Sequence, residues 1–134
     1  IGENQQCKIV STSPSTYEGQ TVSYYFTVSD LFFSQTSKIG KGIKIDTMPP
    51  TFNTVTPAEN QVFDSAYVDL HVEINELGEI IYAIDGESPK KLCSKCLSNE
   101  KTIRLKYPGM HLIEITATDF AGNSADITRH FETN

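Results

Sequence analysis

The sequence contains no tryptophan, few basic side chains and no long apolar run. None of its segments approaches the roughly 18 consecutive apolar residues that a membrane span requires. Its 11 lysines and arginines are outnumbered by 17 acidic residues, which gives a formal net charge of −6. Nucleic acid and anionic lipid are bound by a basic face that neutralises phosphate, so this charge argues against both partners. The polar residues 1–8 lack the layout of a signal peptide, and any export signal is expected outside this sequence.

The spacings of known catalytic motifs are missing as well. No serine or cysteine nucleophile is paired with a histidine and an acid at a recognisable spacing. The sequence has neither a glycine-rich phosphate loop nor the spacing of an EF-hand. We therefore expect no enzyme. His111 is expected to be a half-buried histidine that hydrogen-bonds to nearby backbone rather than a general base.

The apolar residues recur with a period of two. In residues 67–75, Val68, Leu70, Val72 and Ile74 alternate with polar residues, the pattern of a strand with one buried and one wet face. Similar strands, separated by turn residues, are predicted over residues 51–55, 79–85, 102–107, 110–118 and 125–132. The spacing predicts an all-β sandwich with Greek-key connections.

The distribution of charge changes at a pair of prolines. Residues 1–46 are neutral overall, so residues 47–134 carry the whole net charge. Pro49 and Pro50 fix φ and remove two backbone donors, which makes Met48-Pro49-Pro50 a short, stiff connection. We place a domain boundary here, with a complete sandwich domain over residues 47–134.

The N-terminal part repeats the end of the C-terminal part. Residues 21–30 align with residues 110–119 on their last residues, Asp30 and Asp119. The inward positions Val22, Tyr24, Phe26 and Val28 then fall on His111, Ile113, Ile115 and Ala117. We expect residues 1–46 to be the C-terminal part of a preceding sandwich domain in a tandem array. Because a half-sandwich cannot bury both faces of its sheet, it packs on the second domain, pairs with another chain or stays partly disordered.

Four motifs occur in a fixed order along the chain: residues 46–52 (DTMPPTF), Glu76-x-Gly78, residues 81–86 (IYAIDG) and residues 109–123 (GMHLIEITATDFAGN). Together they resemble the bacterial and archaeal immunoglobulin-like (Big-type) repeat of S-layer proteins, adhesins and other secreted or surface-anchored proteins. The resemblance covers residues 46–134 closely and residues 17–46 loosely. It implies an immunoglobulin-like antiparallel β-sandwich of about seven strands that serves as a spacer, stalk segment or adhesive module, with no catalytic residues.

The motif from Asp119 to Asn123 predicts a turn between two paired strands. Asp119 can accept hydrogen bonds from backbone N–H groups a few residues further on, while Gly122 and Asn123 tolerate positive φ. Gly109, which follows Pro108, is expected to form the turn before residues 110–118. This turn chemistry alone accounts for the choice of residues, so we assign these residues a structural role.

Calcium binding is the alternative for some of the acidic residues. Hard cations prefer several carboxylates and carbonyls that converge at a loop or domain junction. Asp46 at the linker, with Glu76 and Asp119 from loops, could supply them. The preferred interpretation is a solvated acidic surface without a bound cofactor.

Leu31, Phe32 and Phe33 are three consecutive apolar residues in an expected loop, which is unusual on a soluble surface. In the preferred interpretation Phe32 and Phe33 pack under a neighbouring loop or domain. The alternative is a contact patch for a protein or glycan partner. The absence of tryptophan, which glycan-stacking platforms favour, weakens the glycan alternative.

Cys93 and Cys96 lie in a polar, lysine-rich segment that we expect between strands. Zinc needs four ligands and this motif supplies two, whereas a redox pair is expected at the N-terminus of a helix in an α/β fold. We therefore favour a Cys93–Cys96 disulfide, typical of proteins outside the cell, over free thiols or a metal. Cys7 is expected to pair with a cysteine upstream of residue 1 or to remain unpaired, and a link to Cys93 or Cys96 stays open.

These observations predict a non-enzymatic structural or adhesive module of a multi-domain prokaryotic surface or secreted protein, located extracellularly or at the cell surface. Its expected partners are neighbouring immunoglobulin-like repeats of the same chain. Two alternatives remain open. One is a module that binds a glycan or a protein, and the other is an accessory domain of a secreted hydrolase whose catalytic part lies outside this chain.

Overall fold

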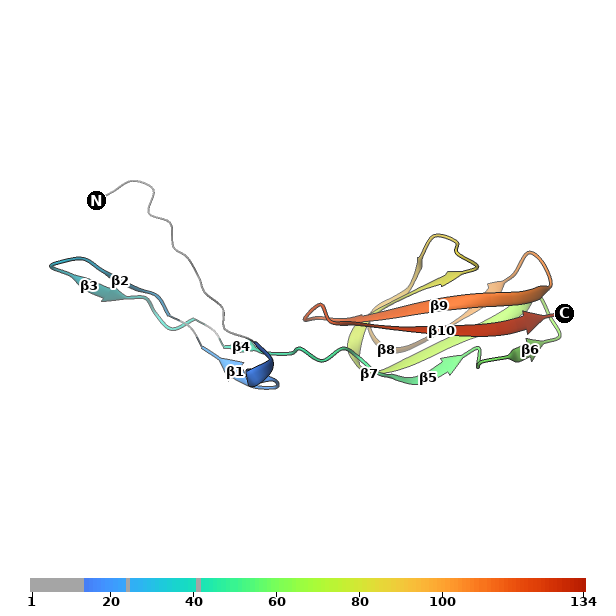
Figure 1. Ribbon diagram of the computed structural model, residues 1–134, viewed down its shortest axis with the longest axis horizontal. Coiled ribbons are helices and arrows are strands. Elements are labelled where there is room, and N and C mark those ends of the chain that lie inside the picture. The colour runs from blue at the N-terminus through green and yellow to red at the C-terminus, as the bar shows by residue number, and fades with distance from the viewer. Residues whose placement is uncertain (1–13, 24, 41) are drawn as a thin grey trace. The chain divides into compact units, whose positions relative to one another are not determined.

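Strands make up nearly all of the regular structure in the computed structural model, which describes residues 14–23, 25–40 and 42–134 (Figure 1). A single 3-10 turn, η1 (Pro14–Tyr17), precedes them. In these ranges no helix is long and apolar enough to cross a membrane. The chain divides into two units, Ile1–Met48 and Pro49–Asn134, close to the boundary expected from the charge shift and the prolines.

The N-terminal unit contains four short strands that form two antiparallel pairs. They are β1 (Thr21–Val22), β2 (Thr27–Ser29), β3 (Ser34–Thr36) and β4 (Ile43–Lys44). β1 pairs with β4 and β2 pairs with β3, so the two pairs together follow one interrupted hairpin. The strand predicted over residues 21–30 is therefore present in two pieces. Tyr24, one of its expected inward positions, lies outside the described residues.

The C-terminal unit is a sandwich of six strands. They are β5 (Phe52–Thr56), β6 (Gln61–Phe63), β7 (Tyr67–Ile84), β8 (Lys90–Arg104), β9 (Gly109–Asp119) and β10 (Ser124–Thr133). The first part of β7 lies between β5 and the end of β8, and its last part lies between β9 and the start of β8. β10 continues the second layer beyond β9, and β6 closes it through a parallel pair with β10. This arrangement confirms the predicted immunoglobulin-like β-sandwich.

Two predicted boundaries are wrong because the long strands pass from one layer to the other. Residues 67–75 and 79–85 belong to one strand, β7, whose pairing with β8 shifts register between Glu73 and Gly78. The segment expected as a polar loop around Cys93 and Cys96 is part of β8. Its polar sequence is compatible with a strand because β8 pairs only with β7 among the described strands and exposes much of its length.

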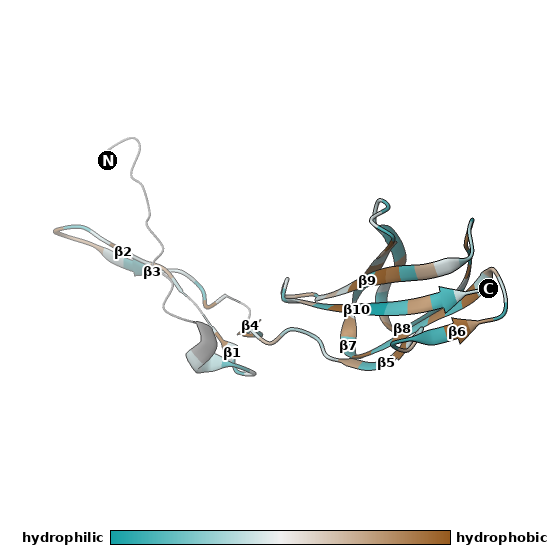
Figure 2. Cartoon of the chain, turned by 45° about the vertical axis from the view of Figure 1, so that its right-hand side comes forward, coloured by the Kyte–Doolittle hydropathy of each residue, from teal (hydrophilic) through white to brown (hydrophobic). Residues whose placement is uncertain are grey.

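The core lies between the two layers. The even-numbered residues of β7 point inward on both sides of the register shift, from Val68 to Ile84. They meet Ile113, Ile115 and Ala117 of β9 and the fully buried Phe131 of β10. Figure 2 shows the corresponding alternation of hydrophobic and hydrophilic residues along β10. The period of two therefore reports burial on one face of each strand.

The chain enters the C-terminal unit through a fixed contact. The backbone N–H of Thr51 donates to Oδ1 of Asn75 at 2.7 Å, and the N–H of Asn75 donates to the carbonyl of Thr51 at 3.1 Å. Pro50 is fully buried just before this contact. The second proline of the linker is therefore part of the C-terminal unit and restricts the chain at the point of entry.

Gly78 lies where β7 changes layers and approaches β9 most closely. It pairs with Asp119, and a Cβ atom built at Gly78 would lie 2.5 Å from the carbonyl oxygen of Thr118. This oxygen belongs to the backbone of β9, which cannot shift aside as a flexible side chain could. Glycine is required here to let the two strands approach.

We expect Gly78→Ala to lower the free energy of unfolding by about 1–3 kcal/mol, because the added methyl group overpacks the β7–β9 contact. Urea unfolding followed by circular dichroism measures the effect. The neighbouring Leu77→Ala is the control, since Leu77 is exposed and its truncation should change stability by no more than about 0.5 kcal/mol. Equal stability of Gly78→Ala and the wild type would contradict the close approach.

Candidate functional site

The turn between β9 and β10 is built on the carboxylate of Asp119. Its Oδ1 accepts the backbone N–H of Asn123 at 2.9 Å, and its Oδ2 accepts the side-chain amide of Asn123 at 2.8 Å. Gly122 has a φ of 95°, in the region that favours glycine, and Gly109 at the other end of β9 has a φ of 125°. The four structural turn candidates thus lie at the two ends of one strand.

Asp119 is 6% exposed, and its charge is held by hydrogen bonds. Burial acts to raise the pKa of this carboxyl group, but hydrogen bonds from Asn123, Gly122 and Ala121 outweigh burial and hold the pKa below its ordinary value. The ionised form is therefore the one that stabilises the turn.

The structure brings two of the three calcium candidates together within one unit. Glu76 and Asp119 each offer a carboxylate oxygen, and these atoms lie within 4.8 Å of each other. Asp46 belongs to the N-terminal unit, where its Oδ1 accepts the backbone N–H of Met48 at 3.2 Å. Calcium takes six to eight oxygen ligands, so two carboxylates are a small part of such a site. Calcium binding therefore stays an alternative to the preferred interpretation of a solvated acidic surface.

The hairpin between β2 and β3 also turns on an aspartate. Oδ1 of Asp30 accepts the backbone N–H groups of Phe32 at 2.7 Å and Phe33 at 2.8 Å, and these bonds lower the pKa of Asp30. The tip of this hairpin is apolar. The side chains of Leu31, Phe32 and Phe33 are 94%, 88% and 80% exposed, so they do not pack under a described loop of their own unit.

His111 is buried and contacts a carboxylate that the sequence did not indicate. Its Nδ1 donates to Oδ2 of Asp85 at 2.7 Å, while Nε2 lies 3.1 Å from the carbonyl of Tyr107 and 3.2 Å from Oγ1 of Thr133. Its ring stacks on Phe131 at 5.3 Å. Burial acts to raise the pKa of Asp85, but hydrogen bonds from His111 and Leu112 outweigh burial and lower the pKa. These contacts tie the end of β7 to β9 and β10.

In the sequence, Asp85 stands out only as part of the motif over residues 81–86. Asp85 has a φ of 52°, and its second carboxylate oxygen accepts the backbone N–H of Leu112 at 2.9 Å. The histidine partner of this carboxylate is more than 20 residues away, and spacing alone does not reveal it.

Cys93 and Cys96 form a disulfide within β8, with Cα atoms 6.2 Å apart. This pairing is consistent with the one favoured from the sequence. Both residues pack against the core, and Sγ of Cys96 lies 3.7 Å from the carbonyl of Gly78. The disulfide therefore lies beside the change of layer in β7. Cys7 lies outside the described residues.

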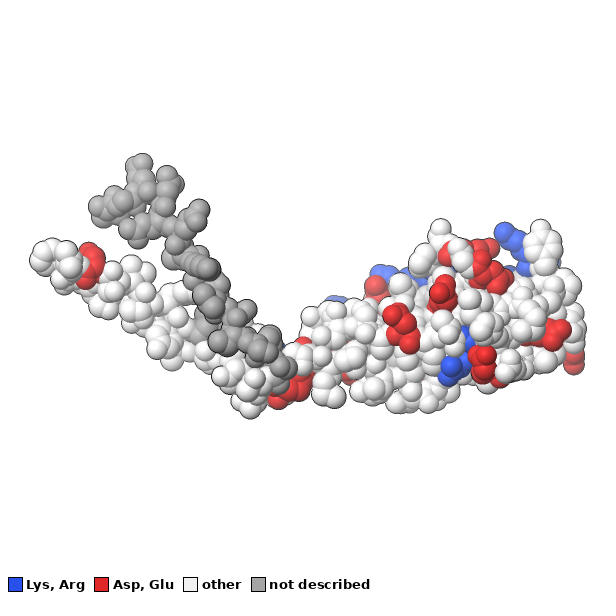
Figure 3. Space-filling model, viewed as in Figure 1, with Lys and Arg blue, Asp and Glu red and all other residues white. Residues whose placement is uncertain are grey.

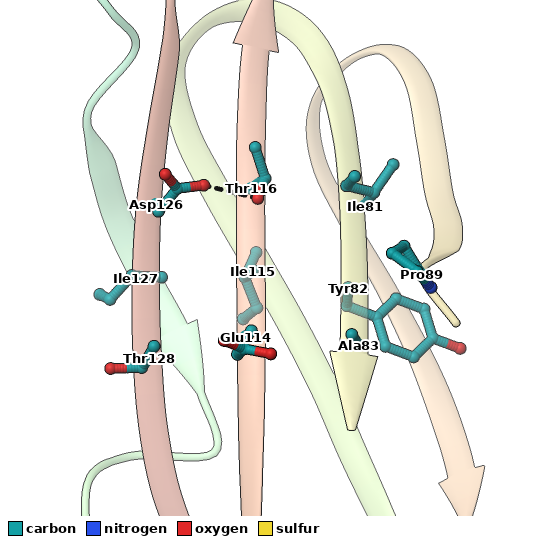
Figure 4. Close-up of a pocket in the computed structure, with 10 residues that line it drawn as sticks. All are labelled: Ile81, Tyr82, Ala83, Pro89, Glu114, Ile115, Thr116, Asp126, Ile127 and Thr128. Atoms are coloured by element: carbon teal, nitrogen blue, oxygen red, sulfur yellow. Dashed lines mark hydrogen bonds between the residues drawn. The ribbon is translucent and has the colours of Figure 1, made fainter. Parts of the chain in front are cut away.

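Several hollows in the described surface are shallow and lie over the strands. One of about 390 Å³ lies over β7, β9 and β10, where Oγ1 of Thr116 donates to Asp126 at 2.6 Å (Figure 4). Another of about 400 Å³ lies beside His111 and is lined by both acidic and basic residues, including Glu87, Lys90 and Lys106. Glu87 forms an ion pair with Lys90 at 2.9 Å. On the face shown in Figure 3, the acidic side chains of the C-terminal unit are spread out rather than gathered in one patch.

Comparison with known proteins identifies the fold. No protein family and no curated protein matches the sequence. An engineered protein has a TM-score of 0.51 and 17% identity; the match covers 63% of this chain and 20% of the engineered one. CopC from Methylosinus trichosporium OB3b has a TM-score of 0.50 and 8% identity; the match covers 63% of this chain and 93% of CopC. The chain thus spans about a fifth of the engineered protein, and both likenesses concern the β-sandwich alone.

We expect the stabilisation by Asp119 to depend on pH. Because its pKa in the folded state lies below the ordinary value of 3.8, the stabilisation is fully present above that value and is lost as the pH falls through the folded-state pKa. Asp119→Asn should therefore melt below the wild type at pH 7, and the difference should shrink toward pH 3. Thermal melts across this range measure it.

Glu114→Gln is the matched control, since Glu114 is an exposed carboxylate on the same strand, and its effect should be small throughout. A constant difference between Asp119→Asn and the wild type at every pH would contradict the charged turn. The same melts with calcium and with EDTA test the cation alternative. We expect no change, whereas a calcium-dependent rise that Glu76→Gln abolishes would establish a calcium site.

Proposed function

We propose that this chain is a non-enzymatic structural or adhesive module: an immunoglobulin-like spacer or stalk segment of a multi-domain prokaryotic surface or secreted protein. The module is of the Big type and acts outside the cell beside neighbouring repeats of the same chain. The observation that carries the proposal is the repeated terminal hairpin, because recurrence of one supersecondary unit is typical of tandem arrays.

The two hairpins correspond in their pairing as well as in their sequence. β1 pairs Val22 with Ile43, as β9 pairs His111 with Phe131 of β10. Each hairpin then turns on an aspartate, Asp30 or Asp119, whose carboxylate accepts backbone N–H groups of the turn. A second copy of the same hairpin directly before the Pro49–Pro50 linker supports an array of sandwich modules.

The buried polar groups of the C-terminal unit support a structural role. Asp119 holds a turn, and His111 joins the ends of three strands through Asp85, Tyr107 and Thr133. In the described residues every buried side-chain nitrogen and oxygen has a hydrogen-bond partner. A fully satisfied polar network of this kind rigidifies the fold around it.

The parallel pair of β6 and β10 supports a role in bearing force. β6 lies near the start of the C-terminal unit and β10 at its end, and three residue pairs join them. A force that pulls the two ends of the unit apart loads these hydrogen bonds together, in shear. The ring of Phe63 in β6 packs edge-on against Phe131 at 6.0 Å and reinforces the contact. The Cys93–Cys96 disulfide is in keeping with an extracellular location.

We expect the C-terminal unit to unfold in one cooperative step when the chain is stretched between its ends in a single-molecule force experiment. Phe63→Ala should lower the unfolding force and cost about 2 kcal/mol of stability, less than the 3–5 kcal/mol of a fully buried phenylalanine, because Phe63 is half-buried.

Val62→Ala is the matched control, since Val62 lies in the same strand with its side chain exposed, and the unfolding force should not change. Gradual extension without a force peak would overturn the structural proposal. An equal loss of force in both variants would show that the β6–β10 contact does not bear the load.

A ligand-binding module is the second candidate, and the exposed tip of the β2–β3 hairpin favours it. Three apolar side chains there are almost fully exposed. If the tip binds a glycan or protein, arrays of extracellular glycans and proteins should give a signal that the double variant Phe32→Ala/Phe33→Ala removes. Tyr107→Ala, which truncates an exposed aromatic residue of the other unit, is the control. Signals equal in all variants would exclude the tip.

A further inference from the structure

The β1–β2 side of the N-terminal hairpin has an open edge. β2 pairs with β3 and β1 pairs with β4, and within the described part of the chain neither has a partner on its other side. An open edge presents unpaired N–H and C=O groups, which are a template for another strand. The corresponding strand of the C-terminal unit, β9, has β10 on one side and β7 on the other.

The backbone groups on this edge can be assigned from the hairpin hydrogen bonds. The N–H of Asp30 donates to the carbonyl of Phe33, and the N–H of Ser37 donates to the carbonyl of Phe26. Because bonded positions alternate in an antiparallel pair, the even-numbered residues turn their backbone toward β3. The backbone groups of Tyr25, Thr27 and Ser29 therefore point to the open edge.

Aligned on the turn aspartates, these three residues correspond to Glu114, Thr116 and Thr118 of β9. Like Leu112, those residues are even-numbered and turn their backbone to the same side of β9. The carbonyl of Leu112 accepts the backbone N–H of Asp85, which directly follows β7. In the C-terminal unit the equivalent backbone groups therefore face β7, which pairs with β9 from Gly78 to Ile84. The N-terminal edge offers the same groups in the same order.

The described inward side chains of the N-terminal hairpin are more exposed than those of β9. Phe26 and Val28 are 49% and 68% exposed, whereas the corresponding Ile115 and Ala117 are 1% and 0% exposed. The sequence pattern of a buried strand is thus present without burial. Both the edge and the face are complementary to the rest of a sandwich.

We propose that residues 25–30 form a docking edge for an antiparallel strand of the β7 kind, with apolar residues at alternate positions, supplied by the preceding sandwich module of a longer chain. This inference rests on the proposed function, since it requires an array. In the register of the C-terminal unit, residues equivalent to Ile80 and Tyr82 lie opposite Val28 and Phe26. The strand adds to the sheet by β-augmentation.

A second copy of this chain is the less favourable occupant. Two copies of the edge could pair with each other and satisfy their backbone groups, but this pairing would bring no second layer to the face of Phe26 and Val28. A sandwich module brings a second layer to that face, as β5 and β8 do in the C-terminal unit. Because a sandwich module would cover both the apolar face and the open edge, we favour it over a second copy as the occupant.

The experiment uses the full chain labelled with nitrogen-15 and a synthetic peptide with the sequence of residues 78–85 (GEIIYAID) as the probe. We expect the peptide to shift the amide signals of residues 25–30 and to slow hydrogen exchange of Tyr25, Thr27 and Ser29. The signals of the C-terminal unit should not move. A peptide of the same composition without the alternation of apolar residues is the control and should not bind.

Val28→Asp should weaken binding of the peptide by at least about tenfold, because it places a charge on the apolar face. Thr27→Asp is the matched variant: it places the same charge on the opposite face of the same strand and should keep binding within about twofold. Both positions are exposed, and their substitution leaves the core unchanged.

Absence of exchange protection at residues 25–29, or equal binding by Val28→Asp and the wild type, would overturn the docking edge. A dimer in sedimentation that forms without peptide and is lost in Val28→Asp would assign the edge to a second copy and also overturn the proposal. The force experiment separates the two claims. A cooperative force peak without peptide binding would support the structural module and overturn the docking edge. Peptide binding without a force peak would support the docking edge and overturn the structural module.

Discussion

β7 hydrogen-bonds to β5, β8 and β9 along its 18 residues, and this shared strand holds the two layers of the C-terminal unit together. It can pass between the layers because its even-numbered residues point inward on both sides of the register shift. In addition, Gly78 lets its backbone approach that of Thr118. The disulfide in β8 and the Thr51–Asn75 contact both lie near this change of layer. Most of the core depends on the path of this strand.

The two hairpins show how far local sequence determines structure. Both turn on an aspartate that accepts backbone N–H groups, since turn chemistry acts over a few residues and needs no distant partner. Their apolar faces differ, because among the described residues the C-terminal hairpin alone has a strand such as β7 to pair with and a second layer to cover it. The same pattern is a core strand in one unit and an exposed face in the other. The proposed docking edge follows from that difference.

Two buried polar residues of the C-terminal unit, Asp119 and His111, stabilise strand ends and turns. Asp119 closes one end of β9, while His111 and Asp85 join the other end to β7 and β10. Each carboxylate is kept ionised by donors of the fold itself, since hydrogen bonds lower its pKa more than burial raises it. Such contacts make the sandwich rigid, which suits a module whose proposed role is to keep its shape under load.

Alternating apolar residues predicted the β-sandwich, and proline, glycine and aspartate predicted the linker and the turns, because these signals depend on neighbouring residues. The tertiary structure decided what depends on distant partners. It made residues 90–104 a strand through pairing with β7, joined His111 to Asp85, and brought Glu76 close to Asp119. It also left Phe26 and Val28 exposed despite a core-like pattern. Sequence fixes which face of a strand is apolar, but burial requires another surface to cover that face.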